Sequence, residues 1–147
     1  SHYEGQVAIE WNHAAETLEG AAPWPVDLDT SGPVAQVDLR AATRAFLRSL
    51  RNREPVPGLS ARFHATVIAA TAALVERAAR EHGRLPVVLG GGCFQNPLLT
   101  EGLLAALSPR FTVWLPRQVP PGDGGISLGQ VLVAAARNER PVLCEVS

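Results

Sequence analysis

Apolar residues repeat at helical spacing in two stretches in the middle of the chain. From Asp38 to about Arg53 they fall on one face, opposite arginines that suit a solvated face. Asp38 fits the cap of this helix, because an aspartate oxygen can accept hydrogen bonds from the free N–H groups of a first turn. The second stretch runs from Ser60, also a capping residue, to about His82, and Gly83 suits a left-handed helix end. The pattern predicts two consecutive helices.

Less regular patterns precede these two helices. Residues 3 to about 19 fit either a strand or a helix, and their alanines and glutamates favour a helix. Residues 20–37 mix prolines and glycines with aspartate and serine, which predicts an irregular or short-stranded surface segment without site residues.

Short apolar runs typical of buried strands dominate the chain after Gly83. Residues 85–89 and 111–115 each read as such a strand. The first is followed by a glycine turn and a helix from about Pro97, and the second by a proline- and glycine-rich loop and a helix over residues 126–138. Strands that alternate with helices predict an α/β fold, in which helices pack on a short sheet.

The composition is that of a single globular domain. With 147 residues and 46% hydrophobic content, the chain can bury a core, so we expect residues 1–147 to form one domain or part of one. The 13 basic and 14 acidic residues nearly cancel, which argues against nucleic acid or an anionic membrane as a partner. The longest apolar runs, such as residues 67–75, are shorter than the ~20 residues of a membrane span.

The ends and the cysteines add two expectations. The two cysteines, Cys93 and Cys144, make a poor disulfide framework, so we expect a cytoplasmic protein. The chain opens at Ser1 without Met, and we expect it to begin within a longer protein.

The first motif with chemical content is the run of Gly90, Gly91 and Gly92. Glycines let a ligand approach the main chain, and their N–H groups, with the positive end of the helix that follows, suit a phosphate or a ribose. The same segment fits a tight strand-to-helix turn, in which Asn96 caps the helix and Pro97 is its first residue. The two interpretations are compatible.

The second motif places one carboxylate, Asp123, between prolines and glycines at the start of the last predicted helix. Its surroundings suit a ligand of a hard or borderline metal ion. Aspartate is also a preferred helix cap, and the motif taken alone favours that role. The sequence holds no dinucleotide or P-loop glycine pattern, and no HExxH, CxxC or HxxxH. His64, on the long helix, is expected to be structural, and Cys93 has no assigned base that would make it a nucleophile.

Taken together, LGGGCFQN at residues 89–96 and VPPGDGGISLGQ at residues 119–130 resemble the end of the HypF family of hydrogenase-maturation carbamoyltransferases. YEGQ at residues 3–6 and ARFH at residues 61–64 are also similar to family segments. In that family these segments close a domain similar to the tRNA threonylcarbamoyl-transfer enzymes. The resemblance therefore implies half of an actin-like, Hsp70-like ATPase (ASKHA) fold.

The resemblance also implies a reaction in two stages. Carbamoyl phosphate and ATP give a carbamoyl-adenylate, and the carbamoyl group passes to the C-terminal cysteine of the partner HypE, for the cyanide ligand of nickel–iron hydrogenases. Asp123 would hold a divalent metal (iron, zinc or magnesium) beside the phosphates. The nucleotide would be contacted by Gly90, Gly91, Gly92, Asn96, Gly5 and Glu4.

Departures from the family pattern keep other functions open. The HxxxH pair that shares the metal in the family is absent, Gly90 stands where serine is usual, and Pro97 stands where a basic residue is common. We therefore expect the isolated chain to be inactive without the rest of the polypeptide. The alternatives are a stand-alone, non-catalytic nucleotide-binding or protein-interaction module with the same fold, a tRNA threonylcarbamoyl-transfer enzyme fragment, and a small hydrolase that uses Cys93.

Overall fold

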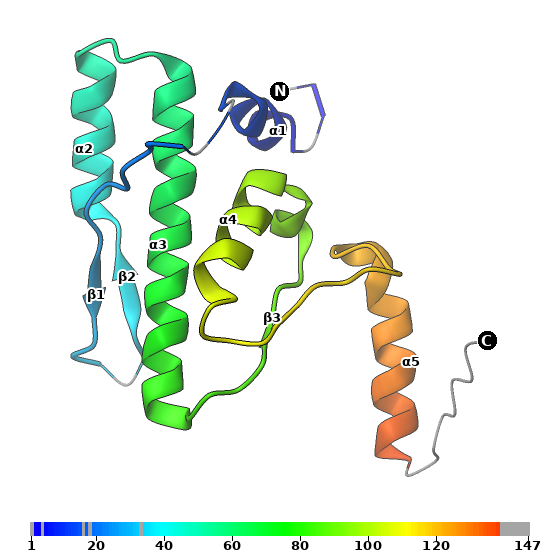
Figure 1. Ribbon diagram of the computed structural model, residues 1–147. Coiled ribbons are helices and arrows are strands. Elements are labelled where there is room, and N and C mark those ends of the chain that lie inside the picture. The colour runs from blue at the N-terminus through cyan, green and yellow to red at the C-terminus, as the bar shows by residue number, and fades with distance from the viewer. Residues whose placement is uncertain (1, 4, 16, 18, 33, 139–147) are drawn as a thin grey trace.

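A long central helix organises the molecule in the computed structural model, which describes residues 2–3, 5–15, 17, 19–32 and 34–138. This helix, α3, has α2 on one side and α1 and α4 on the other (Figure 1). The helices are α1 (Gln6–Ala14), α2 (Arg40–Arg51), α3 (Val56–His82), α4 (Pro97–Leu107) and α5 (Ile126–Arg137). The strands are β1 (Asp27–Asp29), β2 (Gln36–Asp38), β3 (Val87–Val88) and β4 (Val113–Trp114). Two 3₁₀ turns, η1 (Gly92–Gln95) and η2 (Asp123–Gly125), precede α4 and α5.

Helix α3 begins earlier than its sequence pattern predicts. Pro55 is its N-cap and Pro57 lies in its first turn, where a missing N–H removes no intrahelical hydrogen bond. The prediction that Ser60 caps this helix is wrong, because Ser60 lies inside it and is fully buried. Gly83 ends the helix with a positive φ of 81°, as expected, but its ψ of 173° is extended rather than left-handed helical.

Helix α2 begins close to its predicted start. Its N-cap is Leu39, so the prediction that Asp38 is the cap is wrong by one residue. Asp38 ends β2, and its Oδ1 still accepts from the N–H of Arg40 at 2.9 Å. The carboxylate thus satisfies the first N–H of the helix from just outside it.

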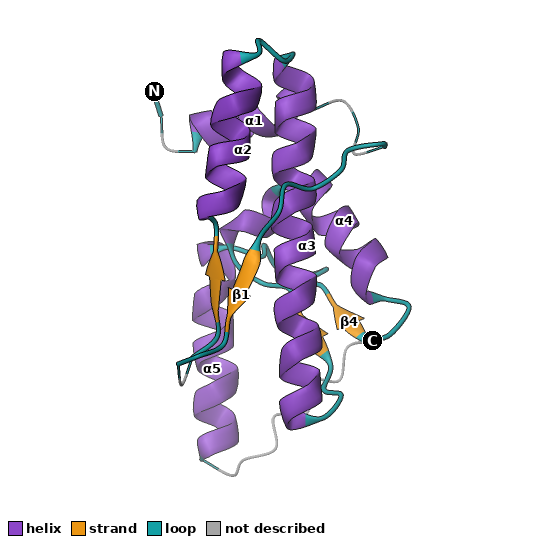
Figure 2. Ribbon diagram, turned by 90° about the vertical axis from the view of Figure 1, so that its left-hand side faces the viewer, coloured by secondary structure: helices purple, strands orange, loops and turns teal. Residues whose placement is uncertain are grey.

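Two small sheets flank the helices. Strands β1 and β2, in the segment predicted to be irregular or short-stranded, form an antiparallel ribbon with Leu28 opposite Val37 (Figure 2). Strands β3 and β4 pair in parallel, with Val87 opposite Val113, and α4 connects them. The predicted order of strands and helices is confirmed, but each strand of the parallel pair is shorter than its apolar run.

Two clusters of buried side chains lie on the two sides of α3. The first joins α2 to the segment before β1 through Trp24, Ala42, Ala45 and Leu59. The second packs α4 and β3 on α3 through Leu89, Leu103 and Leu107. An ion pair between Arg110 and Glu76 also ties the segment after α4 to α3. Both clusters therefore pack against α3, which holds α2 and the segment before β1 on one side and α4 and β3 on the other.

Helix α3, with 27 residues, is also long and apolar enough to span a membrane. The short apolar runs in the sequence did not suggest this. A core helix of a soluble protein has the same properties, and α3 packs against three other helices.

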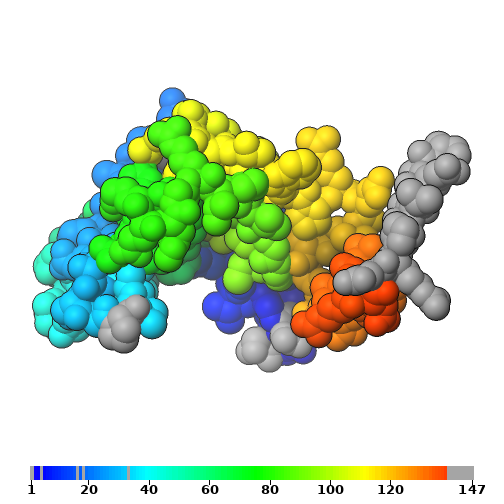
Figure 3. All heavy atoms as spheres, turned by 90° about the horizontal axis from the view of Figure 1, so that it is seen from below, coloured from blue at the N-terminus to red at the C-terminus, as the bar shows by residue number. Residues whose placement is uncertain are grey.

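Helix α5, like α1, has no buried residue. In the view from below it lies at one side of the molecule, away from α2 (Figure 3). Its exposed apolar residues are Ile126, Leu128, Val131, Leu132 and Val133.

Candidate functional site

A groove of about 520 Å³ lies where the start of α1 meets α3 and the start of α4. It brings together Gly5 and Asn96, two predicted nucleotide contacts that are far apart in the sequence. Phe63 and Trp11 contribute aromatic surface, with ring centroids 6.1 Å apart in an edge-to-face arrangement. The residues that line the groove are Tyr3, Gly5, Gln6, Val7, Ala8, Trp11, Phe63, His64 and Asn96.

Asn96 is the N-cap of α4, as the sequence predicts. Its Oδ1 accepts from the N–H of Leu99 at 3.0 Å, and Pro97 follows as the first residue of the helix. Its Nδ2 lies 2.9 Å from Nε2 of His64 on α3. Asn96 is half-buried, so it has both a structural role and a face on the groove.

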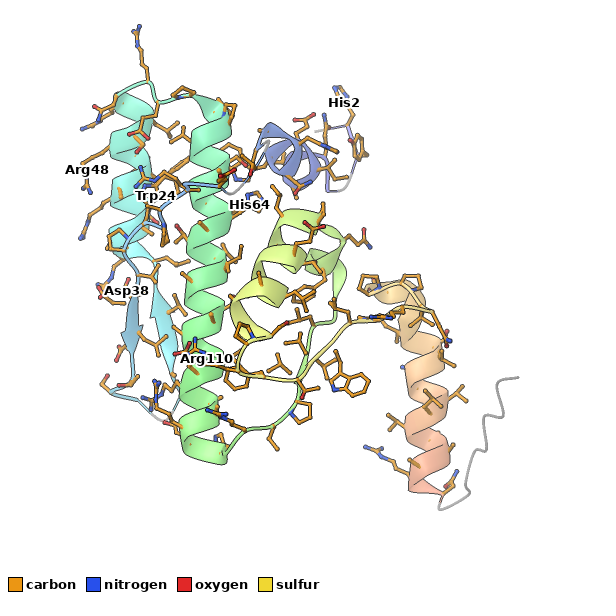
Figure 4. All side chains as sticks on the ribbon, viewed as in Figure 1. His2, Trp24, Asp38, Arg48, His64 and Arg110 are labelled. Atoms are coloured by element: carbon orange, nitrogen blue, oxygen red, sulfur yellow. The ribbon has the colours of Figure 1, made fainter. Side chains whose placement is uncertain are left out.

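His64 is buried beneath the groove, with 3% of its surface exposed. Figure 4 shows its side chain on the side of α3 that faces α1 and α4. Its Nδ1 lies 2.8 Å from the carbonyl oxygen of Ser60 one turn earlier. The expectation that His64 is structural is confirmed, but its contact with Asn96 was not foreseen.

Ser60 extends this network to α1. Its hydroxyl donates to the carbonyl oxygen of Trp11, so the buried serine fastens the end of α1 onto α3. Because α1 forms one wall of the groove, this hydrogen bond helps to set the shape of the groove.

Gly5 precedes α1 in a left-handed conformation, with φ 80° and ψ −6°. A side chain is disfavoured there, which accounts for a glycine at the rim of the groove. Its carbonyl accepts from the N–H of Ile9 at 3.0 Å. Glu4, the other predicted ribose contact, lies outside the described residues.

The three glycines and the proline-glycine loop, which are separate in the sequence, touch in the structure. The N–H of Gly91 donates to the carbonyl oxygen of Pro121 at 2.5 Å, so this N–H is already paired. A Cβ on Gly122 would lie 3.2 Å from Nε2 of Gln95 and 3.6 Å from Cα of Gly92. Two of the predicted motifs therefore form one exposed double loop, connected to Asn96 by η1.

Asp123 is exposed on this double loop at the start of η2. The interpretation of Asp123 as the cap of the last helix is wrong, because Gly125 occupies that position and no side-chain cap is formed. No group of three or more histidine, cysteine, aspartate or glutamate side chains that could hold a metal occurs among the residues that the structure describes. Asp123 can thus supply one carboxylate ligand, and this part of the chain does not form a complete metal site.

Cys93 is exposed in η1. Within the described part of the chain, no hydrogen bond joins its thiol to a histidine or a carboxylate. Since a thiol nucleophile requires a base or another activating group, the geometry gives the Cys93 hydrolase no support.

Comparison with known proteins extends these observations. The family model for "Carbamoyltransferase, Kae1-like Domain, second subdomain" matches residues 1–130. Carbamoyltransferase HypF2 of Cupriavidus necator is 48% identical over 79 residues, which cover 53% of this chain and 10% of that protein. Carbamoyltransferase HypF of Synechocystis sp. is 30% identical over 131 residues, which cover 88% of this chain and 16% of that protein. The chain thus spans about a tenth to a sixth of these relatives.

Two solved structures share the fold. The crystal structure of full-length HypF in the phosphate- and nucleotide-bound form matches with a TM-score of 0.88 and 31% identity, covering 95% of this chain and 18% of that one. HypF of T. kodakarensis matches with a TM-score of 0.79 and 24% identity over the same shares, a likeness that shows the fold alone. The predicted α/β fold is confirmed.

Proposed function

This chain belongs to the HypF carbamoyltransferases, and from that premise we propose that it forms the nucleotide-binding portion of such an enzyme. The observation that carries the proposal is the groove in which Gly5 and Asn96 meet. The solved HypF of similar fold that is described as phosphate- and nucleotide-bound supports it. The ligand is ATP or its adenylate product.

In this proposal the adenosine occupies the groove and the phosphates lie along the double loop. Gly5, with Glu4 beside it, approaches the ribose, and Asn96 contacts the base. Gly90 and Gly92 offer main-chain N–H groups to the phosphates, whereas that of Gly91 is already paired with Pro121. Main-chain donors of this kind stabilise negative charge without reorganisation.

Asp123 would be one ligand of a divalent metal that neutralises phosphate charge. Its exposure on the double loop, beside the glycines, fits that role. Because no group of three or more potential ligand side chains occurs among the described residues, we propose that the other ligands come from the rest of the polypeptide. Metal binding by this chain alone is then weak.

The complete reaction proposed for the longer protein uses carbamoyl phosphate and ATP to make carbamoyl-adenylate in the cytoplasm. The carbamoyl group is then transferred to the C-terminal cysteine of HypE, in the synthesis of the cyanide ligand of nickel–iron hydrogenases. Since the chain spans at most 18% of the HypF proteins compared above, it supplies nucleotide binding and not the whole reaction.

Helix α5 favours a second role, as a binding surface for another protein segment. Its large apolar residues are exposed and no residue of the helix is buried, and such a surface is typical of an interface. This role is compatible with nucleotide binding, because α5 does not line the groove.

A nucleotide titration followed by NMR tests the proposal. ADP is expected to shift the amide signals of Gly5, Asn96 and the three glycines at positions 90–92. Val7→Trp adds bulk at the groove and is expected to weaken binding about tenfold. Val34→Trp is the matched control, since Val34 is 68% exposed and Val7 69%, but only Val7 lines the groove. Shifts confined to other surfaces, or equal effects of the two variants, would contradict the proposal.

A further inference from the structure

The hydrogen bonds around His64 have a fixed direction because main-chain groups stand at both ends. The N–H of Leu99 can only donate, so the atom of Asn96 that faces it at 3.0 Å must be the oxygen. The carbonyl of Ser60 can only accept, so Nδ1 of His64, 2.8 Å away, must carry a proton. Between them, Nδ2 of Asn96 donates to an unprotonated Nε2.

Each other arrangement places like groups against each other. A flipped Asn96 amide would set its NH₂ against the N–H of Leu99 and its oxygen against the Nε2 lone pair. A second proton on His64 would set an N–H against the Asn96 NH₂. Because a buried polar group without a partner is costly, the N–H of Leu99 and the neutral Nδ1–H tautomer of His64 together hold the amide in one orientation.

This orientation determines what Asn96 offers to the groove. A carboxamide has two N–H donors and an oxygen with two lone pairs. One N–H is used by His64 and one lone pair by Leu99, which leaves one donor and one acceptor on the same amide. A fixed donor and acceptor on one amide match adenine, which presents an amino donor next to the N7 acceptor. Guanine presents two acceptors, O6 and N7, so one of them would face the Asn96 oxygen, which is also an acceptor.

We propose that His64 is a positioning residue that fixes the Asn96 amide so that the groove selects adenine over guanine nucleotides. The inference rests on the proposed nucleotide binding. His64 acts through Asn96, because its own ring is 3% exposed and its two nitrogens are taken up by Ser60 and Asn96. Phe63, 44% exposed at the same groove, offers an aromatic face for any base and does not discriminate between them.

The test compares the affinities of the full chain for ADP and for GDP by calorimetry. The wild-type chain is expected to prefer ADP, and His64→Ala to lower that preference roughly tenfold, because the amide is then held at its oxygen alone, by the N–H of Leu99. His64→Gln keeps an acceptor within reach of Nδ2 and is expected to restore part of the preference. Circular dichroism confirms that each variant is folded.

The possible results separate the two proposals. A wild-type chain that binds neither nucleotide overturns the proposed function, and the selection with it. A wild-type chain that binds ADP and GDP equally overturns the inference alone. An undiminished preference for ADP in a folded His64→Ala variant also overturns it. If His64→Ala does not fold, the preference for ADP over GDP is compared between the wild type and His64→Gln instead. An equal loss of affinity for ADP and GDP in His64→Gln contradicts the inference.

Discussion

Nδ2 of Asn96 lies 2.9 Å from Nε2 of His64, although the two residues are 32 positions apart. One contact thus connects the first half of α3 to the cap of α4, beneath the groove that we assign to a nucleotide. The position of the proton on the buried His64 ring and the orientation of the Asn96 amide therefore depend on each other.

Replacing Asn96 by aspartate is expected to reverse the polarity of this contact. A carboxylate can still cap Leu99, but its other oxygen faces Nε2 and requires a proton there. We expect the ¹⁵N signals of His64 to be pyrrole-type at Nδ1 and pyridine-type at Nε2 in the wild type, and pyrrole-type at both in Asn96→Asp. Asn96→Ala, which offers no oxygen, serves as the control and keeps Nε2 unprotonated. A pyridine-type Nε2 in Asn96→Asp would show that the contact is not formed.

A second prediction concerns the attachment of α1. Ser60→Ala removes the donor to the Trp11 carbonyl in a fully buried position. Leaving such a carbonyl unsatisfied is expected to lower the free energy of unfolding by about 1–3 kcal/mol. Urea denaturation measures this, and hydrogen exchange should rise mainly in α1.

Ser127→Ala is the matched control for that experiment. Ser127 is exposed on α5 and makes no side-chain cap. A surface change of this kind is expected to stay within about 0.5 kcal/mol of the wild type. Equal stabilities of the two variants would contradict the role assigned to Ser60.

The sequence predicted those features of the fold that depend on residues close together in the chain. Periodicity located the two central helices, apolar runs located the parallel strands, and Asn96-Pro97 identified the start of α4, because each signal arises from residues close together in the chain. Local signals failed where tertiary contacts decide. Ser60 has the chemistry of a cap, but it lies inside α3 and donates to the Trp11 carbonyl, and Gly125 rather than Asp123 is the N-cap of α5.

The candidate site was predicted residue by residue but not as an arrangement. The sequence singled out Gly5 and Asn96 without indicating that they share a groove, since that depends on how α1 and α4 pack on α3. It gave no signal for the pairing of Asn96 with His64 or for the contact of Gly91 with Pro121. Only the resemblance to a family grouped the two loops, and the structure shows that they touch.

The run of three glycines at positions 90–92 allows a test in which Gly91 is the site of the variant and its neighbour Gly90 the site of the control. Gly91 has φ 111°, a conformation that a residue with a side chain rarely adopts, whereas Gly90 does not have a positive φ and has open space around it. Gly91→Ala is expected to lower the free energy of unfolding by about 1–3 kcal/mol through backbone strain. Gly90→Ala should be nearly neutral in thermal unfolding. Similar losses in both variants would indicate that the loop does not require a glycine at position 91.

The last prediction concerns the ion pair at the start of α2. Hydrogen bonds from the side chain and the N–H of Arg40 lower the pKa of Asp38 to about 2. Because the pKa is lower in the folded state, the stabilisation that this pair provides is present above the ordinary value of 3.8 and is lost as the pH falls through about 2. Both side chains are in contact with solvent, so the contribution to stability is small. The carboxyl titration itself is therefore the better measurement.

Arg40→Gln is expected to move the pKa of Asp38 part of the way back towards 3.8, since the N–H at position 40 still donates to Oδ1. Asp29 is the internal control. Its pKa is lowered chiefly by hydrogen bonds from Ser31, so it should change little in this variant. NMR titration of the carboxyl carbons follows both groups in one sample. An unchanged Asp38, or equal shifts of Asp38 and Asp29, would mean that Arg40 is not the cause of the low pKa.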